Sequence, residues 1–290
     1  MKKLISFSGK GRRADIGDMT IYRLLPNRFA DAAGPFVFLD HIAPTIVEPP
    51  INDKKRGTGP HPHRGIATLT YLLNGQDVHL DSRGNHALVS SGGVQWMKAG
   101  NGIIHDEYLT TDPATNDNLT HGFQFWINLP SKNKLEDPQY LAIQAEDVPF
   151  RNLSYDTGWM KVIAGKFDDL ESIIPEYSTQ FIYHLCINAG KQFSFSTKSG
   201  LEYAAFLPLK NMRINDAEFN EGEYIEFDRN DGTIELHNNT SDATDILIFG
   251  GERYLEPIVA EGPFVMNSRQ EIAAAYRDFH AGKYGKIGQL

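Results

Sequence analysis

Short stretches in which hydrophobic and polar residues alternate run through most of this sequence. The segment 19–25 alternates in this way, and the segment 121–130 places its phenylalanines on one side of an extended chain and Gln124 and Trp126 on the other. Turn-forming residues, mostly glycine with asparagine, serine or aspartate, interrupt these stretches roughly every 8–12 residues. Because no long helical periodicity accompanies them, the pattern predicts an all-β protein built as a sandwich or barrel.

The second half of the chain repeats the style of the first, so we expect a second barrel of similar length. Periodicity is lost over Ser131–Pro138, and we place the boundary there, with an N-terminal domain at residues 1–134 and a C-terminal domain at 135–290. The strands predicted for the second half are Met160–Ala164, Phe181–Ile187, Phe193–Ser196, Tyr203–Leu207, Tyr224–Phe227, Thr233–Leu236 and Asp245–Phe249.

The C-terminus carries a different period. Ser268 followed by Glu271 is a capping box, and Ile272 and Ala275 begin an apolar stripe at helical spacing. We therefore predict a helix of about three turns that ends before Gly282 and packs its stripe against a barrel.

Composition excludes several classes of function. The chain of 290 residues is 41% hydrophobic and 22% charged, as in ordinary globular proteins, and its net charge of −9 argues against direct binding of nucleic acid. No run approaches the roughly 18–20 apolar residues that span a bilayer, and the N-terminus lacks the apolar core of a signal peptide. The one cysteine, Cys186, lies in an apolar run and is interpreted as a core residue, so a cytoplasmic location is expected.

Two short motifs carry the candidate chemistry. His61 and His63 are separated by one residue, as are His105 and Glu107, and on a strand this spacing puts both side chains of each pair on the same face. Two such strands side by side would direct three imidazoles and one carboxylate toward a common point. These donors suit one divalent ion, which could be iron, manganese, cobalt, nickel, copper or zinc, and they leave positions open for a substrate.

The remaining polar groups are interpreted more conservatively. His41, His79 and His121 lie in apolar strands, where a histidine satisfied by hydrogen bonds is more common than a ligand. His79 or His121 could instead orient a ligand from outside. In the second half His184 and His237 have no polar partner two residues away that would complete a ligand set, so we expect that barrel to hold no metal.

Six runs of the sequence carry a family resemblance: GPFVFLDHI, GPHPHRGIATLTYLLNG, HLDSRGN, VQWMKAGNGIIHDE, GGERYLEPI and GPFVMNSRQEI. They resemble the pirin family, a branch of the cupins. The resemblance implies an all-β fold of two tandem cupin (jelly-roll) barrels with a short C-terminal helix, and an iron(II) ion inside the first barrel. It also implies that His61, His63, His105 and Glu107 are the metal ligands.

Two positions depart from the family pattern. Pirins commonly keep a glutamate at the position of Ala67, which we place on the same strand face as His61 and His63, so the pocket is expected to lack a second carboxylate. Gly93 stands where pirins often carry aspartate, and there we expect an effect on a turn more than on the metal.

The resemblance also implies what the chain does. Pirins can act as quercetin 2,3-dioxygenases, in which a flavonol and dioxygen are the substrates, and here Glu107 would be both a ligand and the base that accepts the flavonol proton. The alternative is a metal- or redox-dependent regulatory protein that binds a transcription factor or a metabolic enzyme. A third hypothesis is a cupin that acts on some other substrate.

Overall fold

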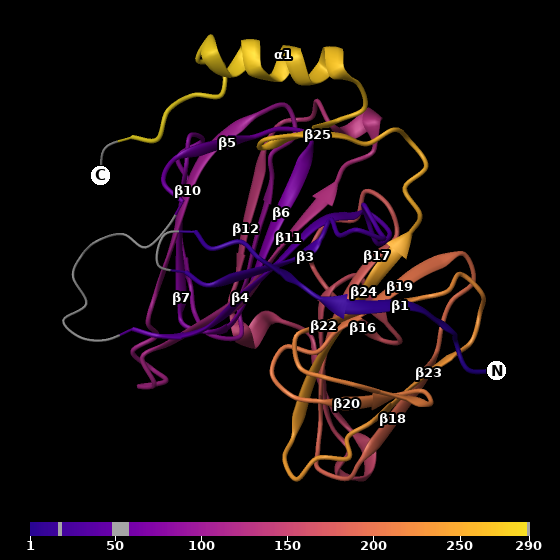
Figure 1. Cartoon of the computed structure of the whole chain (residues 1–290). Helices are drawn as coiled ribbons and strands as arrows, with labels where there is room; N and C mark the ends of the chain where they lie inside the picture. The colour runs from indigo at the N-terminus through magenta and orange to yellow at the C-terminus, as the bar shows by residue number, and fades with distance from the viewer. Residues whose placement is uncertain (17–18, 48–57, 289–290) are drawn as a thin grey trace. The chain divides into compact units, whose positions relative to one another are not determined.

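The structure is a computed structural model that describes residues 1–16, 19–47 and 58–288 (Figure 1). The sequence from residue 48 to residue 59 is rich in proline, charge and glycine, which predicts a loop, and most of it lies outside the described residues. Strands dominate the described chain and one α-helix follows them near the C-terminus, so the all-β class predicted from the alternating pattern is confirmed.

The chain forms two compact units, which we call the N-terminal barrel and the C-terminal barrel. Each is assembled from segments that are distant in sequence. The domain boundary that the sequence predicts between residues 134 and 135 stays a prediction. The N-terminal barrel comprises residues 13–23, 37–147 and 255–290, and the C-terminal barrel comprises residues 1–12, 24–36 and 148–254.

Two antiparallel sheets make up the N-terminal barrel. One has the strand order β5-β10-β7-β8 and the other β12-β9-β6-β11-β4-β3-β2. Their bounds are β2 (Arg12–Arg13), β3 (Ile21–Leu25), β4 (Phe36–Ile46), β5 (His61–His63), β6 (Ile66–Asn74), β7 (Gln76–Asp81), β8 (His86–Val89), β9 (Val94–Lys98), β10 (Ile103–Thr110), β11 (Leu119–Asn128) and β12 (Gln139–Ile143), with short 3-10 helices η1 (Ser131–Asn133) and η2 (Ala145–Asp147).

The C-terminal barrel repeats this plan with sheets β1-β22-β19-β24-β17-β14-β13 and β18-β23-β20-β21. Each strand predicted for the second half is present, within a few residues of its expected bounds. The bounds are β1 (Ile5–Lys10), β13 (Phe150–Leu153), η3 (Ser154–Asp156), β14 (Gly158–Ala164), β15 (Lys166–Phe167), β16 (Leu170–Glu171), β17 (Gln180–Ile187), β18 (Gln192–Ser196), β19 (Leu201–Phe206), β20 (Met212–Ile214), β21 (Ala217–Phe219), β22 (Glu223–Phe227), β23 (Thr233–His237) and β24 (Thr244–Glu252).

Strand β17, which lies between β24 and β14 in its sheet, contributes to the core of the C-terminal barrel. All eight of its residues are buried, which explains why its apolar run hardly alternates. Leu185 and Ile187 pack with Ile246 and Ile248 of β24 in the main apolar cluster of this barrel. Burial raises the pKa of the Cys186 thiol to about 12, so this cysteine is an unreactive core residue, as predicted.

A hairpin and the helix complete the N-terminal barrel. The hairpin joins β25 (Val259–Glu261) to β26 (Phe264–Met266), and α1 (Arg269–His280) packs Ile272 and Ala275 against β26, so the predicted helix is confirmed. Ser268 caps the helix by accepting a hydrogen bond from the Glu271 backbone N–H.

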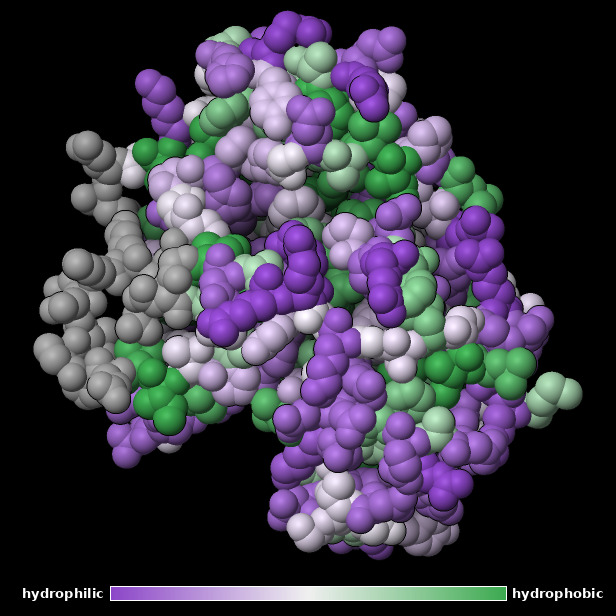
Figure 2. Space-filling view, viewed as in Figure 1, coloured by the Kyte–Doolittle hydropathy of each residue, from purple (hydrophilic) through white to green (hydrophobic). Residues whose placement is uncertain are grey.

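The described surface agrees with the composition. Figure 2 shows hydrophilic residues interspersed with small hydrophobic groups on the face in view, as on the surface of ordinary globular proteins. Among the described residues, no helix has the length and apolar character needed to cross a membrane.

A buried lysine holds three parts of the N-terminal barrel together. Lys134 is 1% exposed, and its ammonium group donates hydrogen bonds to the carbonyls of Gly65 and Val265, each at 2.8 Å, and to the side chain of Asn128. Burial lowers the pKa of Lys134 to about 7. The amino group thus links the turn after β5, the end of β11 and the hairpin strand β26.

Replacing Lys134 by methionine should lower the free energy of unfolding, because two buried carbonyls lose a donor, at a cost of about 1–3 kcal/mol. The pKa of Lys134 is about 7 in the folded chain, whereas that of a free lysine is 10.5. Between pH 7 and 10.5 the unfolded chain therefore binds more protons than the folded chain. Over this range the contribution of Lys134 to the free energy of unfolding rises by roughly 1 kcal/mol per pH unit. Urea unfolding of both proteins at pH 6.5, 8 and 9 measures this.

The exposed neighbour Lys132 provides the control, since Lys132→Met should leave stability unchanged at each pH. If the difference between the parent and Lys134→Met stays constant from pH 7 to 9, the amino group is not desolvated as described.

Candidate metal centre

Strand register brings the two histidine motifs together. Strands β5 and β10 pair antiparallel, with His105 opposite His61 and Ile103 opposite His63. Residues opposite each other in an antiparallel pair share a face, so all three imidazoles project from the same side of this sheet. The arrangement predicted from the two spacings is therefore confirmed for the histidines.

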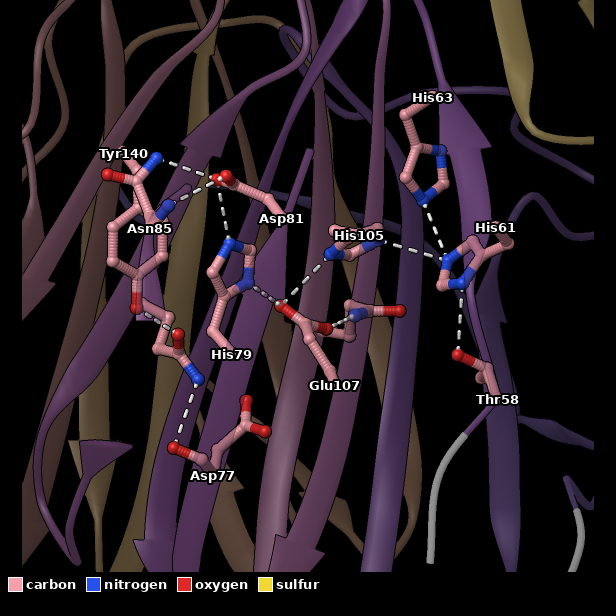
Figure 3. A network of polar contacts seen from close by, with 12 residues as sticks. Thr58, His61, His63, Asp77, His79, Asp81, Asn85, His105, Glu107 and Tyr140 are labelled. Carbon is pink, nitrogen blue, oxygen red and sulfur yellow. Dashed lines mark hydrogen bonds and ion pairs between the residues drawn. The ribbon is translucent and has the colours of Figure 1, made fainter. Parts of the chain in front are cut away.

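The three imidazoles converge on one point (Figure 3). The Nε2 atom of His61 lies 3.1 Å from Nε2 of His63 and 3.0 Å from Nε2 of His105. Adjacent nitrogen ligands of one ion are separated by about 2.9–3.4 Å when each metal–nitrogen bond is about 2.0–2.1 Å. His63 and His105 are almost completely buried, and His61 is partly exposed.

The other ring nitrogens are committed to backbone carbonyls. Nδ1 of His61 lies 2.8 Å from the carbonyl of Gly59, and Nδ1 of His63 lies 3.0 Å from that of Pro263. A carbonyl only accepts, so each Nδ1 carries the hydrogen and each Nε2 presents a lone pair. Two lone pairs that face each other at 3.1 Å repel unless a cation lies between them, so the residues present fit a metal ion.

Protonation states support the same conclusion. Burial lowers the pKa of both His61 and His63, and the neighbouring imidazole of His105 lowers both further. At neutral pH both rings are therefore uncharged, as a histidine must be to coordinate a metal.

Glu107 lies one step further along the same face. Its Oε1 is 3.6 Å from Nδ1 of His105, the ring nitrogen that points away from the three converging Nε2 atoms, and its Oε2 accepts a hydrogen bond of 3.0 Å from Gln124. Burial alone would raise the pKa of Glu107, but His105 and His79 beside the carboxylate bring it well below its usual value. The structure thus brings three of the four predicted ligands together, and ligation by Glu107 stays a prediction.

A second histidine supports Glu107 from the neighbouring strand β7. His79 lies between two carboxylates, with Nε2 3.2 Å from Asp81 and Nδ1 3.5 Å from Glu107 (Figure 3). Burial opposes a charge on this ring, but the neighbouring carboxylates of Asp81 and Glu107 raise its pKa to about 9. Tyr140 stacks on it with ring centroids 4.1 Å apart. His79 is thus hydrogen-bonded through Nε2, whereas its buried Nδ1 has no hydrogen-bond partner among the described residues and faces Glu107 at ion-pair distance.

A small cavity adjoins His61 and Glu107. Polar groups that line it include Thr70 and Gln124, and apolar groups that line it include Ile21, Ile42 and Leu109. Its volume is about 50 Å³, which is below the roughly 300–1,000 Å³ of pockets for drug-sized ligands. A larger molecule would therefore have to displace part of the apolar wall.

The interpretation of Ala67 was wrong. A turn at Gly65, where φ is +81°, ends β5, so Ala67 lies in β6 of the other sheet. In β6 the residue facing the site is Thr70, which lies opposite Gln124, whereas Ala67 lies opposite Ile127 and so points to the other face. The alanine therefore does not remove a carboxylate from the pocket.

The remaining histidines have other partners. His41 and His121 form a buried pair with their Nε2 atoms 2.9 Å apart, and His184 contacts Asp245 at 3.0 Å. In the described part of the chain, both clusters of three potential metal ligands lie in the N-terminal barrel, and both include His105. The expectation that the C-terminal barrel holds no metal stays a prediction.

Several residues at the site were not identified as such from the sequence. Gln124 binds Glu107, and the Trp126 ring lies 4.9 Å from that of His63. The alternation in 121–130 did place both on one face, but it could not show that this face lines the site. Tyr140 lies in β12, just after the segment where periodicity is lost, and no local pattern marks it.

Two all-β barrels with candidate metal ligands inside one of them define a bicupin. Family comparison agrees, because residues 19–127 match the pirin family and residues 182–285 match the pirin C-terminal cupin domain. The chain belongs to the pirin family.

Similar proteins cover the whole chain. A Pseudomonas aeruginosa protein provisionally named quercetin 2,3-dioxygenase is 32% identical over 286 residues, covering 98% of this chain and 99% of that protein. A Caulobacter vibrioides pirin-like protein is 30% identical over 275 residues, covering 94% and 92%. The crystal structure of a quercetin 2,3-dioxygenase from Acinetobacter baumannii has a TM-score of 0.90 at 30% identity and covers 99% of this chain and 100% of that one.

Removing one imidazole should weaken metal binding strongly. We expect the parent to bind one divalent ion per chain. The metal content of His63→Ala should fall, because the variant lacks one nitrogen donor, the ring that the Pro263 carbonyl holds in place. The partly exposed His237 of the C-terminal barrel is the matched control, and His237→Ala should retain the parental metal content. Elemental analysis of the purified proteins after equal exposure to Fe(II) measures this, and two ions per parental chain would contradict the single centre.

Ala67→Glu should leave metal affinity unchanged within about twofold. The new carboxylate would lie opposite Lys98 in the strand register rather than among the histidines. Titration of the metal-free proteins with Mn(II) measures this, and a clear gain in affinity would place residue 67 in the pocket after all.

Proposed function

We propose that this protein is a metal-dependent dioxygenase that cleaves flavonols such as quercetin. The observation that carries the proposal is the pair of facing Nε2 lone pairs of His61 and His63, joined by His105, beside a cavity with apolar walls. The provisional name of the Pseudomonas relative and the name of the Acinetobacter structure support this substrate class.

We propose His61, His63, His105 and Glu107 as the ligands of one divalent ion, with iron(II) favoured over manganese, cobalt, nickel, copper and zinc. When bound, such an ion supplies a Lewis acid that favours the anionic form of a flavonol 3-hydroxyl and a site for reaction with dioxygen. Three neutral imidazoles and one carboxylate would leave a divalent ion with a net positive charge, and this charge would attract the flavonol anion.

The protein's own groups then have defined tasks. Glu107 is ionised, because its pKa is lowered, and it can accept the flavonol proton. Gln124 holds Oε2 of this carboxylate, and His79 contacts Oε1. The side chains of Ile42 and Leu109 exclude water from the reacting edge of the substrate.

The direct test is quercetin turnover. Metal-free protein loaded anaerobically with Fe(II) should consume quercetin when air is admitted, with release of carbon monoxide, and a chelator added beforehand should abolish the reaction. If protein fully loaded with Fe(II) does not turn over flavonols, the enzymatic proposal is overturned and the alternative of a regulatory protein is favoured.

Glu107→Gln separates the two roles proposed for the carboxylate. The three imidazoles remain, so part of the metal should be retained, whereas turnover per bound metal should fall by roughly 10²–10⁴-fold, as is typical when a general base is lost. Asp106→Asn is the matched control, because Asp106 lies next to Glu107 on the same strand and points to the opposite face. Should Glu107→Gln keep near-parental turnover per metal, Glu107 is not the base.

A further inference from the structure

The C-terminal barrel contains a cavity that the metal centre does not explain. Its volume is about 570 Å³, which lies within the range of small-molecule pockets. Side chains of β13, β15, β18 and β19 line it, and among the described residues no histidine or cysteine does so. The described lining therefore offers no imidazole or thiolate ligand to a metal.

Aromatic side chains form one wall of this cavity. Phe167, Phe193 and Phe195 line it and remain partly exposed, although they pack against the buried core of the barrel. Phe167 and Phe195 have ring centroids 5.8 Å apart, and Phe167 also contacts the Tyr183 ring at 5.2 Å. A flat apolar ligand would remove these rings from water and pack against them.

A tyrosine at the rim is held away from the core. The Tyr155 side chain is 93% exposed, and its backbone is left-handed, with φ 58° and ψ 32°. Lys191 donates a hydrogen bond of 3.0 Å to the Tyr155 carbonyl, and Asn188 donates one of 3.0 Å to that of Asp156. These bonds support a left-handed backbone that costs about 1–2 kcal/mol. The exposed Tyr155 ring belongs to the lining of the cavity.

Two of the three cations that line the cavity are paired with carboxylates. Arg151 pairs with Asp168 and Asp169, and Lys166 pairs with Glu171 at 3.0 Å. An anionic ligand would have to compete with these carboxylates for Arg151 and Lys166. The third cation of the lining, Lys198, is exposed to water, where an ion pair contributes little, so the lining favours a neutral molecule.

Hydroxyl groups supply the polar contacts. Tyr183 donates a hydrogen bond to the carbonyl of Lys166 and keeps lone pairs to accept another. Tyr203 accepts a hydrogen bond from the Lys198 backbone N–H, which leaves its own hydrogen to donate. Burial raises the pKa of both phenols, so both stay protonated. The serine hydroxyls of β18 lie beside them.

We propose that this cavity is a second, metal-independent binding site for a neutral, planar aromatic molecule that carries hydroxyl groups. The ligand's rings lie against Phe193, Phe195 and Tyr155, and its hydroxyls exchange hydrogen bonds with Tyr183 and Tyr203. The site does not depend on the proposed flavonol chemistry, because it shares no residue with the metal centre.

The probe is trans-resveratrol, which is planar and neutral and has no pair of oxygens that could chelate a metal. Calorimetric titration of the metal-stripped full-length chain should give saturable binding of one molecule per chain. Tyr155→Gly should weaken binding about threefold to tenfold through the lost ring contact, yet should not lower the melting temperature, because glycine tolerates the left-handed backbone. Phe195→Ala should weaken binding further.

Three controls make the site assignment specific. Phe150→Ala removes an exposed ring outside the lining and should leave affinity unchanged. His63→Ala should also leave it unchanged, because the metal centre is not involved. The anion trans-4-hydroxycinnamate should bind at least tenfold more weakly than the neutral probe.

The proposal is overturned if resveratrol does not saturate the chain or if Phe150→Ala weakens binding as much as Tyr155→Gly. It is equally overturned if His63→Ala abolishes binding, since the probe would then occupy the N-terminal barrel. Tighter binding of the anion would refute the neutral ligand class.

Discussion

The pairing of β5 with β10 in one register is the constraint on which the candidate site depends. A shift of one residue would turn each histidine of β5 to the opposite face, because side chains alternate along a strand. The register is supported from both sides, since β10 also pairs with β7 and places Glu107 opposite His79. Backbone hydrogen bonds therefore decide where the imidazoles meet, and the imidazoles need no contact with each other to be held there.

Burial of several charges close together is the second constraint. Asp77, His79 and Asp81 are buried in the N-terminal barrel, and the side chain of Glu107 beside them is 12% exposed. Burying any one of these charges alone would cost desolvation free energy. Placing the His79 imidazole between carboxylates offsets part of that cost. Burial together with Glu107 raises the pKa of Asp77 well above its usual value, so this carboxyl is the member of the group that gives up its charge.

Local spacing explains what could be predicted from the sequence. Alternation over short stretches indicates strands, and two His-x-His or His-x-Glu pairs indicate a shared face, so the barrels and the three converging histidines follow. Ala67 was misplaced because counting residues from His63 assumes one continuous strand, and the turn at Gly65 breaks that period. Tyr140 and the carbonyl of Pro263 could not be foreseen, because they reach the site from strands and hairpins distant in sequence.

The hydrogen bond from His63 to the carbonyl of Pro263 spans 200 positions of the chain. During synthesis on the ribosome, the strand that carries His63 therefore emerges long before the hairpin that fixes its ring tautomer. Contacts of such large sequence separation cost the most chain entropy to close, so they slow folding. The tautomer and orientation of the His63 ring are consequently fixed only once the C-terminal hairpin has docked.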